Sequence, residues 1–194
     1  MKKTRQSKID ANIRWAKDNI DRVTEYKTKY KNKQKRLAKD YINNIKSRGC
    51  KICGTKNIHC LDFHHRPEHT KKDTVCNLVR QGYSFNTIKK EIEKCDIICS
   101  NCHRSKHYTG NYMRNKKGIK VHEIKSNSKC KHCGYTKVEC LDFHHLLDKK
   151  DSIGSMTRDK KINMEQLEAE ISKCIILCSN CHRTLHANGT GKEH

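Results

Sequence analysis

The sequence has few proline and aromatic residues, and it lacks the long apolar segments of membrane and secreted proteins. It has one proline, three phenylalanines and one tryptophan among 194 residues. No run of 18 apolar residues occurs, which excludes a transmembrane helix and a membrane partner. The N-terminal MKKTR is not followed by the apolar segment of a secretory signal. We therefore expect a soluble, cytoplasmic protein, and the Lys-, Asn- and Ile-rich composition favours one encoded by a bacterium or a phage.

Acidic residues are also scarce. The 21 Asp and Glu residues stand against 43 Lys and Arg residues, which gives a formal net charge of +22. Solubility alone needs far less charge and usually mixes both signs. An excess of this size favours a polyanionic partner, and we expect double-stranded DNA.

Cysteine, in contrast, is abundant, with 13 residues. Eight of them form four CxxC pairs, and the two-residue gap lets both thiolates of a pair converge on one tetrahedral ion. In the expected intracellular compartment such pairs indicate metal rather than disulfides. The pairs are Cys50/Cys53, Cys99/Cys102, Cys130/Cys133 and Cys178/Cys181.

An internal repeat organises the chain. CKICGTKNIHCLDFHH at 50–65 aligns with CKHCGYTKVECLDFHH at 130–145, and EIEKCDIICSNCHRSKH at 91–107 aligns with EISKCIILCSNCHRTLH at 170–186. Small domains bury too little surface to be stable alone, so each copy is expected to need a staple. We assign one structural Zn²⁺ to the first and second CxxC pairs and another to the third and fourth, because four thiolates close a tetrahedral site. The other cysteines are interpreted as buried small hydrophobic residues: Cys60, Cys76, Cys95, Cys140 and Cys174.

Residues 1–48 precede the repeat, have almost no Gly or Pro, and are predicted to form one long basic helix. A weak heptad pattern along this arm could pair two chains into a homodimer or dock on the chain's own body, and its lysines could contact phosphates or only solvent. The remaining predicted segments are a first unit at 49–108, a basic polar linker at 109–128, a second unit at 129–188, and a tail at 189–194.

Within each unit the sequence predicts a short hairpin followed by two helices. The first CxxC pair and the LDFHH run form the hairpin, with the double histidine on a strand. Apolar residues at helical spacing around 85–95 and 164–174 predict the first helix. The second helix is expected to begin at Ser100 in one unit and Ser179 in the other, which are plausible N-caps.

The remaining histidines are grouped. His103 and His107 lie four residues apart on a predicted helix, as do His182 and His186, so each pair projects from one helix face where a metal can bridge it. Adjacent strand residues point to opposite sides, so one histidine of each HisHis pair should coordinate and its neighbour should act as a base.

The order CxxC, LDFHH, CxxCHR and a further histidine resembles the zinc-containing HNH endonucleases, part of the His-Me finger or ββα-metal group. The resemblance covers residues 50–107 and 130–186. It implies an α+β fold class, with zinc-stapled, treble-clef-like ββα-metal units in tandem behind the N-terminal helix. It also implies hydrolysis of phosphodiester bonds to 5′-phosphate and 3′-hydroxyl ends.

Carried onto this sequence, the resemblance makes His65 and His145 general bases. The ligands of a catalytic divalent ion would be His64, His103 and His107 in the first unit and His144, His182 and His186 in the second. Many members carry Asp where His64 and His144 stand, so the ion could be Mg²⁺, Mn²⁺ or another divalent ion.

Two further pairs of residues have predicted roles. Asp62 and Asp142 would orient a ligand histidine or ligate the ion themselves. Arg104 and Arg183 could hold a flanking DNA phosphate, or be exposed helix arginines.

The function predicted from the sequence is therefore a metal-dependent DNA endonuclease. Two sites in one chain could make the monomer a pseudo-dimer that cuts both strands, although one unit could be inactive. A zinc-finger DNA-binding protein that never cuts, and an RNA-directed nuclease or toxin, use the same charge and cysteines. Basic residues on phosphates carry no sequence information, so the target sequence is not predicted.

Overall fold

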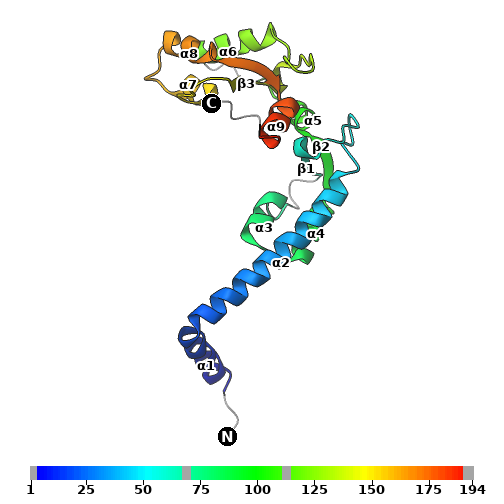
Figure 1. Cartoon of the computed structure of the whole chain (residues 1–194), viewed down its shortest axis with the longest axis vertical. Coiled ribbons are helices and arrows are strands. Elements are labelled where there is room, and N and C mark those ends of the chain that lie inside the picture. The colour runs from blue at the N-terminus through cyan, green and yellow to red at the C-terminus, as the bar shows by residue number, and fades with distance from the viewer. Residues whose placement is uncertain (1–3, 67–70, 111–114, 190–194) are drawn as a thin grey trace. The chain divides into compact units, whose positions relative to one another are not determined.

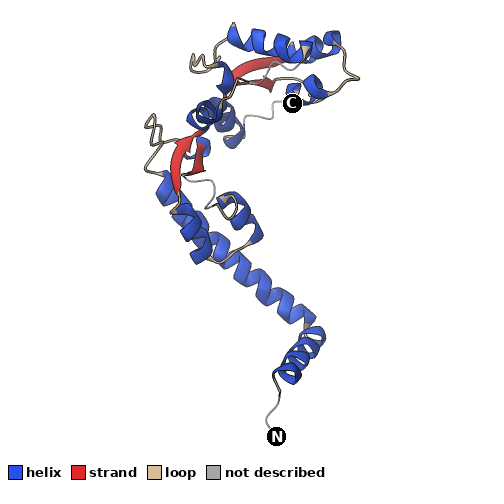
Figure 2. Ribbon diagram, turned by 180° about the vertical axis from the view of Figure 1, so that it is seen from behind, coloured by secondary structure: helices blue, strands red, loops and turns tan. Residues whose placement is uncertain are grey.

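The structure, a computed structural model, describes residues 4–66, 71–110 and 115–189. Helices predominate, and two two-stranded sheets accompany them (Figures 1 and 2), which confirms the α+β fold class. The chain divides into two compact units that do not coincide with the two repeat copies. The first unit comprises residues 1–44 and 65–95, and the second comprises residues 45–64 and 96–194. Among the described residues, no helix is both long enough and apolar enough to span a membrane.

In the first unit the basic arm forms two helices, α1 (Arg5–Asp18) and α2 (Ile20–Lys46), so the prediction of one long helix was wrong. The break falls at Asn19, whose backbone leaves the helical region at φ −119° and ψ 36°. Its backbone N–H and its side-chain amide both donate to the Trp15 carbonyl. An asparagine side chain that competes for backbone partners in this way favours a helix end.

Part of α2 docks on its own unit. Gln34 and Ala38 are buried, although Gln34 interrupts the apolar heptad positions in the sequence. The Gln34 side-chain oxygen accepts from the backbone N–H of Phe85, the first residue of α4 (Phe85–Ile92), and thereby caps that helix. The Tyr41 ring packs edge-on against Phe85 at 5.5 Å. In Figure 1, α2 and α4 accordingly run side by side, and α3 (Val75–Gln81) precedes α4.

The second unit contains the whole second copy and, of the first copy, residues 49–64 and 96–108. In the second copy, strand β3 (Leu141–His145) pairs antiparallel with β4 (Cys174–Cys178), with Leu141 opposite Cys178 and His145 opposite Cys174. In the first copy, β1 (Leu61–His65) pairs with β2 (Cys95–Cys99). The sequence prediction paired LDFHH with the first CxxC segment and was wrong. In each copy the paired residues are 29 positions apart or more, which is outside the reach of hairpin patterns.

Each copy ends in a helix that begins at the second CxxC pair, α5 (Ser100–His107) and α9 (Ser179–Ala187). The serines are not the N-caps. Cys99 and Cys178 hold that position, and their sulfur atoms accept from the backbone N–H three residues later.

A core beside the second sheet joins α6 (Lys116–Ser126), α7 (Ile153–Arg158) and α8 (Met164–Ile171). Leu167 and Met156 are buried there, and Val121 of α6 and Phe143 of β3 pack against them. A helix therefore occupies residues that were predicted to form a polar linker. No residue of α6 is fully buried, and few apolar residues lie on its side toward the core, so its sequence carries little of the helical pattern.

The two copies pair through α5 and α9 by reciprocal contacts. The Ser100 and Ser179 hydroxyls hydrogen bond to each other at 2.5 Å. The Asn101 backbone N–H donates to the Asn180 side chain at 3.1 Å, and the Asn180 backbone N–H donates to the Asn101 side chain at the same distance. Such mutual exchange is the signature of an isologous interface with an approximate two-fold axis.

The same interface continues onto two short 3₁₀ helices, η1 (Ile58–Cys60) and η3 (Val138–Cys140), each of which packs on the helix of the other copy. Asn57 donates to Thr184 at 2.8 Å on one side of the axis, and Ser105 donates to Glu139 at 2.7 Å on the other. The tandem copies thus behave structurally as two halves of one assembly.

Candidate metal centres

Two tetracysteine clusters stand where the sequence predicted them. In each cluster the four sulfur atoms lie within 4.8 Å of one another: Cys50, Cys53, Cys99 and Cys102 in one, and Cys130, Cys133, Cys178 and Cys181 in the other. The first CxxC pair sits on a tight turn that ends in a glycine at φ +75°, Gly54 or Gly134. Only glycine adopts that conformation without strain, so the turn is built into both copies.

The dimensions of the clusters fit zinc. The Cys53 and Cys99 sulfurs are 3.6 Å apart, and the Cys133 and Cys178 sulfurs are 3.7 Å apart. Tetrahedral zinc with Zn–S bonds of about 2.3 Å requires sulfur separations of about 3.8 Å. Burial raises the pKa of Cys50 and Cys130, but backbone hydrogen bonds outweigh burial and lower each pKa to about 7. Burial and the neighbouring thiols raise the pKa of Cys102 and Cys181 in the same clusters. These clusters could therefore hold structural zinc.

Of the cysteines outside the clusters, the sequence interpretation is right only in part. Cys60 and Cys140 are fully buried, whereas Cys95 and Cys174 are half-buried at the start of β2 and β4. Cys76 is exposed on α3, so the expectation of burial was wrong there. It occupies a helix position that faces solvent.

Each repeat copy has a cluster of three histidines. His64 gathers with His103 and His107, and its counterpart cluster comprises His144, His182 and His186, with one nitrogen of each residue within 4.8 Å of the others. The His107 and His64 nitrogens are 3.4 Å apart. The His186 and His182 nitrogens are 3.1 Å apart. An ion bound tetrahedrally at about 2.0 Å by imidazoles needs ligand separations of about 3.3 Å, so both clusters fit a divalent ion.

Helix and strand periodicity bring these histidines together. The i, i+4 spacing on α5 and on α9 places two imidazoles on one helix face, and the strand supplies the third. The clusters are graded in exposure, since the strand histidine is buried and the final helix histidine is exposed. An ion held by these three residues would have room for water or substrate on the exposed side.

Asp62 and Asp142 contact the histidine clusters from outside. Asp62 lies 3.1 Å from His103 Nδ1, and Asp142 lies 3.4 Å from His182 Nδ1. Burial opposes ionisation of Asp142, but hydrogen bonds from His182 and Arg104 outweigh it and lower its pKa to about 2. The same balance lowers the pKa of Asp62. An ionised carboxylate on Nδ1 directs the other ring nitrogen, Nε2, toward the cluster, so both aspartates stand in orienting positions.

The second histidine of each strand contacts a buried glutamate that sequence reasoning missed. In the second copy His145 Nε2 lies 3.0 Å from Glu170 on α8, and in the first copy His65 Nε2 lies 2.8 Å from Glu91 on α4. Both glutamates are 2% exposed. The aligned segments EIEKC and EISKC hold these glutamates at equivalent positions, which was the available signal, but nothing local links them to the histidines.

Each buried glutamate is held ionised by three donors. Glu170 accepts from the Lys173 ammonium at 2.8 Å and from the Lys150 backbone N–H at 2.7 Å, in addition to His145. Although burial raises the pKa of Glu170, the hydrogen bonds from Lys173 and from the Lys150 backbone, with Lys173 foremost, lower it to about 2. Glu91 has the same arrangement and a pKa of about 2.

The depressed pKa of Glu170 predicts acid sensitivity. Between pH 4.5 and about 2 the unfolded chain binds a proton at Glu170 that the folded chain does not, so this stabilisation is present above pH 4.5 and is lost as pH falls. We expect Glu170→Gln to show a smaller fall in the free energy of unfolding between pH 6 and 3 than the wild type. Denaturant unfolding at matched zinc content measures this. Glu165→Gln, an exposed change on the same helix, should keep the wild-type slope, and a wild-type slope in Glu170→Gln would contradict the prediction.

An open cavity of about 1050 Å³ lies against the second copy. Histidines and basic residues contribute to its wall, including His145, His182, His186, Arg104, Lys149 and Arg183. The base candidate and two of the three clustered histidines of this copy therefore face one solvent-filled space, which a negatively charged ligand could enter.

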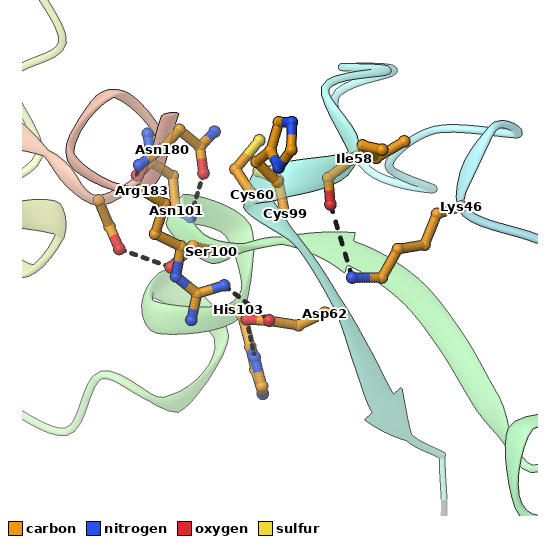
Figure 3. A network of polar contacts seen from close by, with 12 residues as sticks. Lys46, Ile58, Cys60, Asp62, Cys99, Ser100, Asn101, His103, Asn180 and Arg183 are labelled. Carbon is orange, nitrogen blue, oxygen red and sulfur yellow. Dashed lines mark hydrogen bonds and ion pairs between the residues drawn. The ribbon is translucent and has the colours of Figure 1, made fainter. Parts of the chain in front are cut away.

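The two arginines expected at DNA phosphates pair with aspartates of the opposite copy. Arg104 Nη1 donates to Asp142 at 2.7 Å, and Arg183 Nη1 donates to Asp62 at 2.7 Å. Figure 3 shows Asp62 between His103 and Arg183. Contact with phosphate stays a prediction for both arginines.

No family model matches this chain, and no curated protein or solved structure matches it.

Proposed function

We propose that the chain is a metal-dependent DNA endonuclease of the HNH type, with two tandem zinc-stapled ββα-metal units. The observation that carries the proposal lies in the second copy. There a three-histidine cluster and a strand histidine paired with a buried glutamate both contribute to one basic cavity. A zinc-finger protein that only binds DNA needs neither feature, because the tetracysteine cluster already closes its fold.

The strand histidine is suited to act as the general base. Glu170 accepts from His145 Nε2, which leaves Nδ1 to remove a proton from water as the water attacks phosphorus. The carboxylate also stabilises the imidazolium that forms, in the way that a buried acid supports histidine in other hydrolases. Glu91 would serve His65 identically.

The histidine clusters would hold the divalent ion of each copy. When bound, such an ion supplies Lewis-acid stabilisation of the charge that develops on the phosphate and on the leaving oxygen. Asp62 and Asp142 would keep His103 and His182 in the tautomer that presents Nε2. The net charge of +22 supplies the attraction for the DNA backbone.

Cleavage of supercoiled plasmid tests this function. We expect purified protein with two zinc ions to convert plasmid to nicked and linear forms when Mg²⁺, Mn²⁺ or another divalent ion is added. A chain carrying both His103→Ala and His182→Ala, at the same zinc content, should leave the plasmid intact because each cluster has lost a ligand. Absence of wild-type cleavage with every ion would favour the non-catalytic DNA-binding function. Faster cleavage of an RNA substrate would redirect the proposal to RNA.

A further inference from the structure

The metal clusters of the two copies are connected through the copy interface. Asp142 bonds His182 of its own copy through one oxygen and Arg104 of the other copy through its second oxygen. The mirrored chain of contacts runs from Arg183 to Asp62 to His103, and it is visible in Figure 3. Each arginine directly follows a clustered histidine in sequence. Its guanidinium, however, binds the aspartate that contacts the equivalent histidine of the other copy.

The interface fixes this exchange. The bonds between Ser100 and Ser179 and between Asn101 and Asn180 join the N-terminal turns of α5 and α9. Arg104 lies one turn further along α5, so the joined helix ends set its side chain beside β3 of the other copy. In both directions the ion pair has the same 2.7 Å separation.

Folding stability is a poor explanation for these ion pairs. The Arg104 side chain is 40% exposed and Asp142 is 22% exposed. Ion pairs with this access to solvent add little to folding stability. In this pair Arg104 binds one carboxylate oxygen of Asp142, whose other oxygen orients His182. Residues that orient a metal ligand affect the affinity of the site for the metal.

We infer that each three-histidine centre is completed in trans: Arg104 of the first copy is a positioning residue for the second copy's centre, and Arg183 of the second copy is one for the first copy's centre. The inference rests on the proposed function in one respect, that the clustered histidines bind a divalent ion. It makes the duplication a requirement of each site, because a single copy lacks the arginine that its own aspartate uses.

Cobalt binding to chains with one remaining cluster tests the inference. In a zinc-loaded chain with His103→Ala and His107→Ala, only the second copy's cluster can bind Co²⁺, whose visible absorption reports the affinity. Co²⁺ that replaced zinc in a cysteine cluster would show strong thiolate charge-transfer bands. Titrations with those bands are therefore not used to determine the affinity of the histidine cluster. We expect Arg104→Ala to weaken Co²⁺ binding about tenfold, the low end for loss of an outer contact. The matched control Arg183→Ala changes the residue next to the ligand His182 and should leave the affinity unchanged.

The reciprocal chain, with His182→Ala and His186→Ala, should invert the result, so that Arg183→Ala weakens binding and Arg104→Ala does not. Asp142→Asn should reproduce the Arg104→Ala loss in the first background, and the two changes together should add little, because they remove one chain of contacts. Arg104→Lys should recover part of the affinity. Zinc content and melting temperature report whether each variant is folded. If Arg104→Ala does not fold, the Co²⁺ affinities of Asp142→Asn and Arg104→Lys test the inference instead.

The outcomes separate this inference from the proposed function. Equal affinities in all arginine variants, or losses caused by the arginine of the same copy, would overturn the trans arrangement even if plasmid is cleaved. The predicted cobalt pattern without any nucleic-acid cleavage would support the trans arrangement and reject the nuclease. Failure of Co²⁺ to bind either cluster would overturn both.

Discussion

Replacing both His65 and His145 by alanine is expected to lower the rate of plasmid cleavage by about 10²- to 10⁴-fold, the usual contribution of a positioned general base. Each histidine is bonded through Nε2 to a buried glutamate, and alanine leaves no group to accept the proton of the attacking water. Each single variant should keep one working site and therefore produce nicked plasmid with little linear product. Gel assays of supercoiled, nicked and linear forms over time measure all three rates.

Controls make this result specific to proton transfer. Neither His65 nor His145 belongs to a three-histidine cluster, so the variants should keep wild-type Co²⁺ affinity. Glu165→Gln, an exposed change on α8 outside the cavity and both clusters, should cleave at the wild-type rate. If one single variant were inactive and the other fully active, only one copy would cut. Unchanged cleavage by the double variant would reject the assigned base.

Loss of one tetracysteine cluster is expected to unfold the copy that contains it. The core that surrounds this cluster is small, and its buried members are Leu141, Leu177 and two of the cluster cysteines, Cys130 and Cys178. Structural zinc supplies an apparent binding free energy of about 10–16 kcal/mol in small zinc domains. Whole domains are stable by only about 5–15 kcal/mol. A chain with Cys178→Ser and Cys181→Ser should therefore lose cooperative unfolding of the second copy.

Metal analysis and thermal unfolding measure this effect together. The double variant should contain one zinc ion per chain where the wild type contains two, and its near-ultraviolet circular dichroism should weaken. The exposed Cys76 provides the matched control, since Cys76→Ser should keep both ions and stay within about 0.5 kcal/mol of wild-type stability. Retention of two zinc ions and an unchanged melting temperature in the double variant would show that the cluster is not structural.

Prediction from sequence succeeded where short spacings along the chain bring side chains together. The CxxC gap places the two sulfurs of a pair in one cluster, and the i, i+4 spacing of His103 and His107 places two imidazoles on one helix face. Both are consequences of backbone geometry within one turn. The repeat then identified the second member of every set.

Prediction failed where local signals compete with distant partners. Ser100 has the chemistry of an N-cap, yet the neighbouring Cys99 takes that position, and the serine hydroxyl bonds Ser179 across the copy interface. Residues 95–99 have no hairpin turn that connects them to LDFHH, so β2 was missed. Asn19 ended a helix that its lysine-rich surroundings would have continued.

The sequence by itself determined the repeat, the two tetracysteine sets, the histidine sets and the basic charge, because each depends on residue type and on spacing along the chain. Only the tertiary structure decided which groups surround those sets. Glu170 reaches His145 across 25 residues, and Arg183 reaches Asp62 across 121. Contacts over such separations arise from the packing of strands and the pairing of the two copies, and no local periodicity encodes them.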